Sequence, residues 1–132
     1  MFKGSFGYMN FINKALDGSW MRNSAIANNM ANVNTPGYKK ETVNFEDVLR
    51  NELDLNASVK MTKTNSKHID PNNTGEITVD KIGDTNYRVD KNNVDVDVES
   101  GEQAKNTIYY NSLVTEINGQ YNRLKEAMRI NR

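Results

Sequence analysis

Two segments at opposite ends of the 132-residue chain carry apolar residues at intervals that alternate between three and four. This is the heptad spacing of helices that pack along a seam. In the first segment six of eight seam positions are apolar, namely Met9, Ile12, Leu16, Ile26, Met30 and Val33. In the second segment six of seven are apolar, namely Tyr110, Val114, Ile117, Tyr121, Leu124 and Met128. The pattern predicts two long helices that pair antiparallel with each other or pack against neighbouring subunits.

The ends of these helices are predicted from local chemistry. The first should span about residues 8–33, because Thr35 precedes Pro36 and a residue before proline is driven out of the helical region. The second should begin near Ser100, whose hydroxyl can form a capping box with Gln103. We therefore divide the chain into three parts: an N-terminal helix in residues 1–35, a middle segment in residues 36–99 and a C-terminal helix in residues 100–132.

The middle segment has weaker patterns. An amphipathic patch covers residues 45–55, and the polar residues 56–75 are expected to form a loop or to be disordered. From residue 76 apolar residues alternate with polar ones on both sides of a Gly83-Asp84 turn, which predicts a hairpin between the strands around Val79 and Val89. The expected fold class is mainly α, with a long antiparallel coiled-coil-like pair and a small β-containing middle region that is partly disordered or a hairpin.

Composition excludes several classes of protein. The chain has 26% charged residues, a formal net charge of zero and no basic block, which argues against nucleic-acid binding. With 36% hydrophobic residues and a mean hydropathy of −0.79, we expect a thin core that partner subunits complete, or a chain that is disordered in part. No window is apolar enough for a membrane span, and no apolar run of a cleaved secretory signal is present, so any export should use another route.

Residues for catalysis or for holding a cofactor are scarce. The chain has no cysteine, one histidine (His68) and no phosphate-binding glycine motif, so we expect neither an enzyme nor a cofactor. The string Asp95-Val96-Asp97-Val98-Glu99 would gather three acids on one face of a strand, and residues 70–81 resemble a calcium loop. That loop carries Lys81 where a bidentate carboxylate is required. We predict no metal site, and keep a calcium-binding or coiled-coil adaptor module as an alternative of a different class.

An asparagine-rich segment, ANNMANVNTPGYKK at residues 27–40, ends the first helix. Pro36 and Gly37 predict a type II turn. Asn28 and Asn32 fall on the face away from the seam, and each costs about 0.5 kcal/mol of helix propensity relative to alanine. Amides that give and accept hydrogen bonds suit contact with another chain. We therefore predict a subunit interface formed by Asn28, Asn29, Asn32, Asn34, Thr35, Pro36, Gly37 and Tyr38.

This segment resembles the N-terminal signature of the rod and hook family of flagellar axial proteins. The resemblance is carried by Ala27, Asn28, Asn29, Ala31, Asn32, Asn34, Thr35, Pro36, Gly37, Tyr38 and Lys39. Within the family, the short chain, the Phe45-Glu46-Asp47-Val48-Leu49 run and the sequence of residues 92–128 resemble a proximal rod protein. A sister rod protein or a hook-type axial protein is the alternative within the family.

The resemblance implies a structural protein of the flagellar basal body. Members pair their terminal helices antiparallel along a tubular, helical assembly that transmits torque from motor to hook, and the middle segment forms a small outer domain. The implied partners are other rod proteins, the base of the basal body, further copies of the chain, and the flagellar type III export apparatus. Export by that apparatus requires no cleaved signal peptide.

Overall fold

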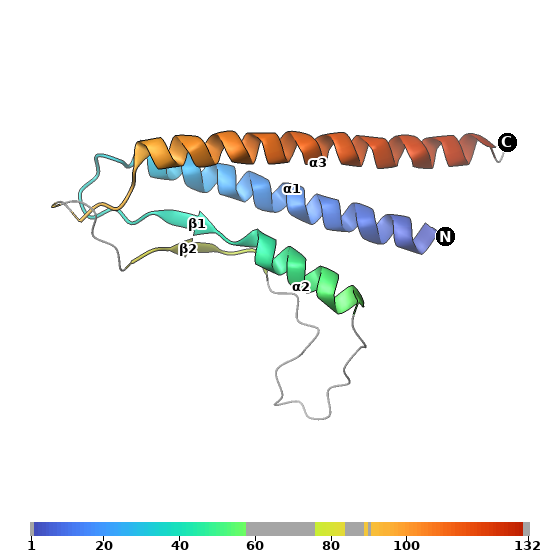
Figure 1. Ribbon diagram of the computed structural model, residues 1–132, viewed down its shortest axis with the longest axis horizontal. Coiled ribbons are helices and arrows are strands. Elements are labelled where there is room, and N and C mark those ends of the chain that lie inside the picture. The colour runs from blue at the N-terminus through green and yellow to red at the C-terminus, as the bar shows by residue number, and fades with distance from the viewer. Residues whose placement is uncertain (1, 58–75, 84–88, 90, 131–132) are drawn as a thin grey trace, which may run out of the picture.

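Helix α1 is the central element of the molecule. The computed structural model describes residues 2–57, 76–83, 89 and 91–130. Its elements in chain order are α1 (Phe2–Ala31), β1 (Glu41–Val43), α2 (Phe45–Ala57), β2 (Val79–Lys81) and α3 (Val96–Ile130). Figure 1 shows α3 along one side of α1, with the strands and α2 on the other side. Contacts of α1 with α3, β1 and α2 make it the support for the rest of the fold.

Helices α1 and α3 run antiparallel. Three hydrogen-bonded side-chain pairs join them, at distances of 3.0, 3.0 and 3.3 Å: Asn29 with Glu99, Ser19 with Asn106, and Tyr8 with Glu116. The residue number on α3 rises as that on α1 falls, which defines the antiparallel direction. Together with the small two-stranded sheet in the middle, this pair confirms the fold class predicted from the heptad pattern.

The face of α1 toward the core includes the predicted seam. Met9, Ile12 and Ile26 are buried, and Leu16, Met30 and Val33 are half-buried. On α3 the face that packs against α1 is shifted by about one residue from the predicted seam. Ile117 is buried and Val114 and Leu124 are half-buried, but Tyr110, Tyr121 and Met128 are exposed.

Hydrogen bonding explains this shift. The hydroxyl of Ser19 donates to Oδ1 of Asn106 at 3.0 Å, and Nδ2 of Asn106 donates to the backbone oxygen of Ser19 at 2.9 Å. These two bonds satisfy a buried polar pair, and they hold Asn106 against α1. Its neighbour Thr107, the one position of the predicted seam in this segment that is not apolar, is exposed.

Helix α3 begins at Val96, four residues before the predicted start at Ser100. The reason is a better cap: Oδ1 of Asp95 accepts from the backbone N–H groups of Asp97 at 2.9 Å and Val98 at 3.3 Å. The acidic string at 95–99 is therefore the cap and first turn of a helix. In that turn the carboxylates interact favourably with the helix dipole. They do not lie on one face of a strand, as the sequence pattern had suggested.

The two short strands pair across a long sequence separation. Strand β1 pairs antiparallel with β2, with Glu41 opposite Lys81 and Val43 opposite Val79. The hairpin prediction paired the Val79 strand with residues 84–90, most of which lie outside the described residues. So do residues 58–75, nearly all of the predicted loop. Among the described residues the partner of β2 is β1, which the hairpin prediction did not include.

The first residue of α2, Phe45, is the largest side chain in the core and is fully buried. It lies over Gly18 of α1, its ring centroid is 5.8 Å from that of Tyr109, and the guanidinium carbon of Arg22 lies 4.3 Å from the ring centre. A small cluster surrounds it, formed by Ala15, Ala25, Val43 and Leu49. Because Gly18 has no side chain, α2 can approach the middle of α1 closely.

Gly18→Ala should destabilise the protein by a net amount of up to about 2 kcal/mol, because an overpacking cost of about 1–3 kcal/mol outweighs the gain of roughly 1 kcal/mol in helix propensity. A Cβ at this position would lie 2.5 Å from Cγ of Phe45. Gly101→Ala is the matched control, since nothing lies within 4 Å of a Cβ at that position in α3, and it should stabilise. Urea unfolding of the two variants measures both effects, and a stabilised Gly18→Ala would contradict the packing.

Candidate functional site at the asparagine-rich end of α1

Asn29 is fully buried and uses its whole carboxamide within the chain. Its Nδ2 donates to the backbone oxygen of Glu41 at 2.8 Å and to Oε2 of Glu99 at 3.0 Å. Its Oδ1 accepts from the backbone N–H of Glu41 at 2.8 Å and from the Tyr38 hydroxyl at 3.2 Å. Asn29 therefore binds both backbone groups of Glu41 as a neighbouring strand would. Asn29 thus joins α1, β1 and α3 within one chain, whereas the sequence pattern predicted that it would lie at a contact between subunits.

A second buried asparagine, Asn92, caps the end of α1. Its Nδ2 lies 3.0, 3.0 and 2.9 Å from the backbone oxygens of Asn32, Val33 and Thr35. Its Oδ1 accepts from the backbone N–H of Val94 at 2.8 Å. These three carbonyls follow Ala31, the last residue of α1, so the Asn92 amide holds the turn directly beyond the end of the helix.

Asn93 fixes the segment that follows the turn. Its Oδ1 accepts from the backbone N–H of Lys40 at 2.7 Å, and its Nδ2 donates to the backbone oxygen of Ile82 at 2.9 Å. Sequence reasoning assigned no role to Asn92 and Asn93. The available signal was a pair of asparagines directly before a helix cap, a residue type that competes well for backbone groups.

A buried ion pair lies beside Asn29. Glu99 is only 1% exposed, and its Oε1 lies 2.5 Å from Nζ of Lys40, whose side chain is 22% exposed. The pairing matters because a buried carboxylate without a partner is costly. Burial, together with the charges of Glu41 and Glu99, raises the pKa of the Tyr38 phenol, so Tyr38 stays a neutral donor to Asn29. Glu99 was foreseen only as one of an acidic string.

The chain turns sharply after the helix. The backbone N–H of Tyr38 donates to the backbone oxygen of Thr35 at 3.3 Å, and Gly37 has a φ of 72°. A positive φ at the third residue of the turn, directly after the proline, is typical of the type II turn predicted from the sequence. Residues 34–37 are exposed, and Tyr38 is half-buried where it reaches Asn29.

Asn28 and Asn32 lie on the outside of this network. Asn28 is exposed and donates to Oε2 of Glu41 at 3.3 Å. Asn32 is half-buried, donates to the backbone oxygen of Asn28 at 2.8 Å and accepts from the Thr35 hydroxyl at 3.2 Å. Both side chains therefore lie away from the contact with α3. Another chain could reach them and the exposed turn from the same side.

The arrangement provides positioning contacts rather than a reaction centre. In the part of the chain that the structure describes, no three His, Cys, Asp or Glu side chains gather closely enough to hold a metal ion. No helix within these ranges is both long and apolar enough to cross a bilayer. His68 and most of the calcium-like segment at 70–81 lie outside the described residues.

Comparison with known proteins identifies the family. Residues 22–39, which include Asn29 and the turn, match the family described as flagella basal body rod protein. Flagellar basal body rod protein FlgB of Bacillus subtilis (strain 168) is 36% identical over 92% of this chain and 93% of its own length. FlgB of Borrelia hermsii is 32% identical, covering 80% and 83%, and FlgB of Escherichia coli (strain K12) is 27% identical, covering 85% and 86%. The chain therefore belongs to the FlgB family of flagellar basal body rod proteins.

Proposed function

We propose that this chain is a structural subunit of the proximal rod of the bacterial flagellar basal body, and that it acts without catalysis. In this proposal its copies assemble into the helical shaft that transmits torque from the motor to the hook. The observation that carries the proposal is 36% identity to a FlgB protein over nearly the full length of both chains. A calcium-binding or adaptor function has no comparable support.

The proposed partners are other rod proteins, the base of the basal body and further copies of the chain. The proposed contact surface is formed by the half-buried Asn32 and by the exposed residues Asn28, Asn34, Thr35, Pro36 and Gly37. Its support is chemical, because the asparagine amides and the Thr35 hydroxyl can exchange hydrogen bonds with another chain without burying a charge. Tyr38 and Asn29 would hold this surface in shape from within.

The proposed location is the flagellar basal body, reached through the flagellar type III export apparatus without a cleaved signal peptide. A thin core favours such a route, because a chain with little buried apolar surface unfolds at low cost. Heterologous contacts between copies would generate a helical array, the symmetry that a shaft requires.

Deletion of the gene tests the proposal in the source bacterium. The deletion strain should be non-motile and should carry no hooks, because assembly would stop at the rod. The wild-type gene supplied in trans should restore both. Normal hooks in the deletion strain would refute the proposed rod function, whether or not that strain swims.

The contact surface is tested by Asn28→Ala combined with Asn32→Ala. The purified double variant should be no less helical by circular dichroism, since alanine has the higher helix propensity. It should nevertheless restore motility poorly in the deletion strain. Asn10→Ala with Asn13→Ala, two exposed asparagines of the same helix, is the matched control and should swim normally. Equal swimming of the two double variants would exclude this surface from assembly.

A further inference from the structure

The turn that follows α1 has little support of its own. Its residues 34–37 are exposed. Within it the backbone N–H of Thr35 donates to the backbone oxygen of Asn32 at 3.0 Å, and that of Tyr38 donates to the backbone oxygen of Thr35 at 3.3 Å. Water competes for hydrogen bonds at the surface, so these two bonds stabilise one shape of the turn only weakly. Further support has to come from another part of the chain.

That support comes from Asn92, which lies 57–60 residues further along the chain than the groups it binds. Its Nδ2 is within 3.0 Å of the backbone oxygens of Asn32, Val33 and Thr35. Its Oδ1 accepts from the backbone N–H of Val94, which fixes the carboxamide with Nδ2 toward the turn. Because Asn92 is fully buried, these bonds form away from competing water.

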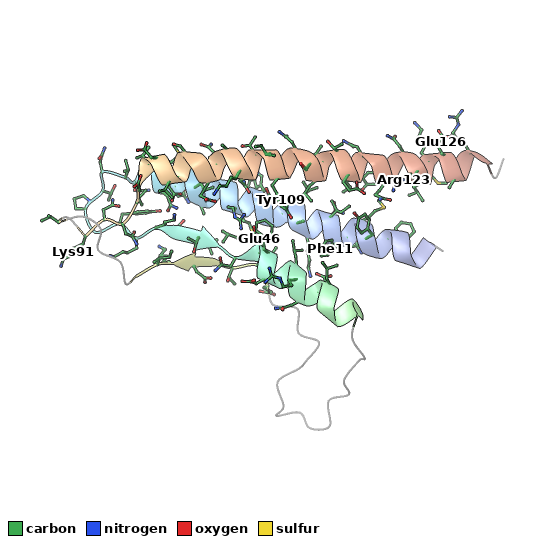
Figure 2. The ribbon with its side chains drawn as sticks, viewed as in Figure 1. Phe11, Glu46, Lys91, Tyr109, Arg123 and Glu126 are labelled. Carbon is green, nitrogen blue, oxygen red and sulfur yellow. The ribbon has the colours of Figure 1, made fainter. Side chains whose placement is uncertain are left out.

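The backbone directly before Asn92 is strained. Among the described residues other than glycine, Lys91 alone has a positive φ, of 62°. Residues with a Cβ rarely adopt this conformation, and it persists where the surrounding contacts require it. The side chain of Lys91 is exposed, so the contacts that require it are those of Asn92. Figure 2 shows Lys91 at the end of the molecule where α1 ends and α3 begins.

We propose that Asn92 is the positioning residue of the proposed contact surface. The turn at residues 34–37 takes the shape that another chain binds only while residues 91–94 are docked beyond the end of α1. The inference rests on the proposed function and specifies how its contact surface is controlled. Because the two segments bind each other, release of either one loosens the other.

This dependence prevents an incomplete chain from associating. The turn lies in the first third of the chain, and Asn92 lies in the last third. The N-terminal part of a chain emerges first during synthesis. A surface that requires residues 91–94 therefore forms only after the last third of the chain has begun to fold back onto α1. Helix α1 alone carries Asn28 but does not suffice for binding.

Hydrogen exchange of the purified full-length chain tests the positioning. In Asn92→Ala the amides of Thr35 and Tyr38 should exchange faster by about tenfold or more, the effect of removing a buried hydrogen-bond partner. Asn106→Ala is the matched control, because it removes another buried asparagine that joins α3 to α1, at Ser19 and away from the turn. It should leave both amides as protected as in the wild type. Equal losses in the two variants would overturn the inference, since they would reflect a general loosening.

Variants of Lys91 test the same point without altering Asn92. Lys91→Gly should keep the turn protected, since glycine adopts a positive φ without strain. Lys91→Val should reproduce the loss expected for Asn92→Ala, because a β-branched residue strongly disfavours this φ and would move Asn92 away from the carbonyls. If the amides of Thr35 and Tyr38 were equally protected in the two Lys91 variants, the inference would be wrong.

Motility separates this inference from the proposed function. Asn92→Ala and Lys91→Val should restore swimming to the deletion strain poorly. Asn106→Ala, with a similar loss of stability in urea unfolding, and Lys91→Gly should restore it well. Normal swimming of the first two variants despite a loosened turn would overturn the inference and leave the rod function standing. A wild-type gene that failed to restore swimming would instead refute the rod function.

Discussion

Asn29→Ala should lower the free energy of unfolding by about 3 kcal/mol or more, because buried polar groups left without partners cost about 1–3 kcal/mol each. The substitution removes the partner of both backbone groups of Glu41 and of one oxygen of Glu99. The Tyr38 hydroxyl, which is less buried, also loses its acceptor, though water can replace it there. Strand β1 should then separate from α1, since Asn29 binds both backbone groups of the first residue of the strand.

Urea unfolding followed by circular dichroism measures this loss. Asn28→Ala is the control, because it alters the neighbouring residue of the same type but removes only one exposed hydrogen bond, worth about 1 kcal/mol or less. Hydrogen exchange adds a local measurement, in which the amide of Glu41 should lose protection first. If the two alanine variants were equally stable, Asn29 would not be the link between these elements.

Periodicity predicted the elements that depend on local sequence. The heptad spacing indicated both long helices and their antiparallel pairing, and Pro36 with Gly37 indicated the turn. The same spacing correctly put Asn28 and Asn32 off the contact with α3. These features follow from the residues within one or two helical turns, so a single sequence is sufficient to predict them.

The buried network could not be predicted in the same way. Asn29 is one of four similar asparagines in the segment, and its role depends on where the chain returns after the turn to place Glu41 beside it. Pairing of β1 with β2 is also set by tertiary contacts, here the bonds of Asn93 to Lys40 and Ile82. Local pattern holds no information about such distant partners.

The choice of face on α3 shows a further limit. Periodicity gives the spacing of a seam but does not decide between adjacent faces when apolar residues occur on both. Tyr110 and Tyr121 suggested one face, whereas the reciprocal bonds of Ser19 and Asn106 select the neighbouring one. A buried polar pair of this kind fixes the register of two helices more specifically than apolar contacts do.

Lys40→Met should destabilise the protein by about 3–5 kcal/mol, the usual cost of removing one partner from a buried ion pair. The carboxylate of Glu99 would keep the amide of Asn29 as a donor but would lose the Lys40 ammonium, which lies 2.5 Å from its Oε1. Methionine preserves most of the length of the lysine side chain, so the loss would reflect charge rather than a cavity.

Adding Glu99→Gln to Lys40→Met should recover part of that loss, because the buried charge that was left without a partner is then removed. The glutamine oxygen can still accept from Nδ2 of Asn29, so that bond of the network is kept. Urea unfolding of the wild type, both single variants and the double variant gives the coupling energy directly. Losses that simply add would mean that Lys40 and Glu99 act independently.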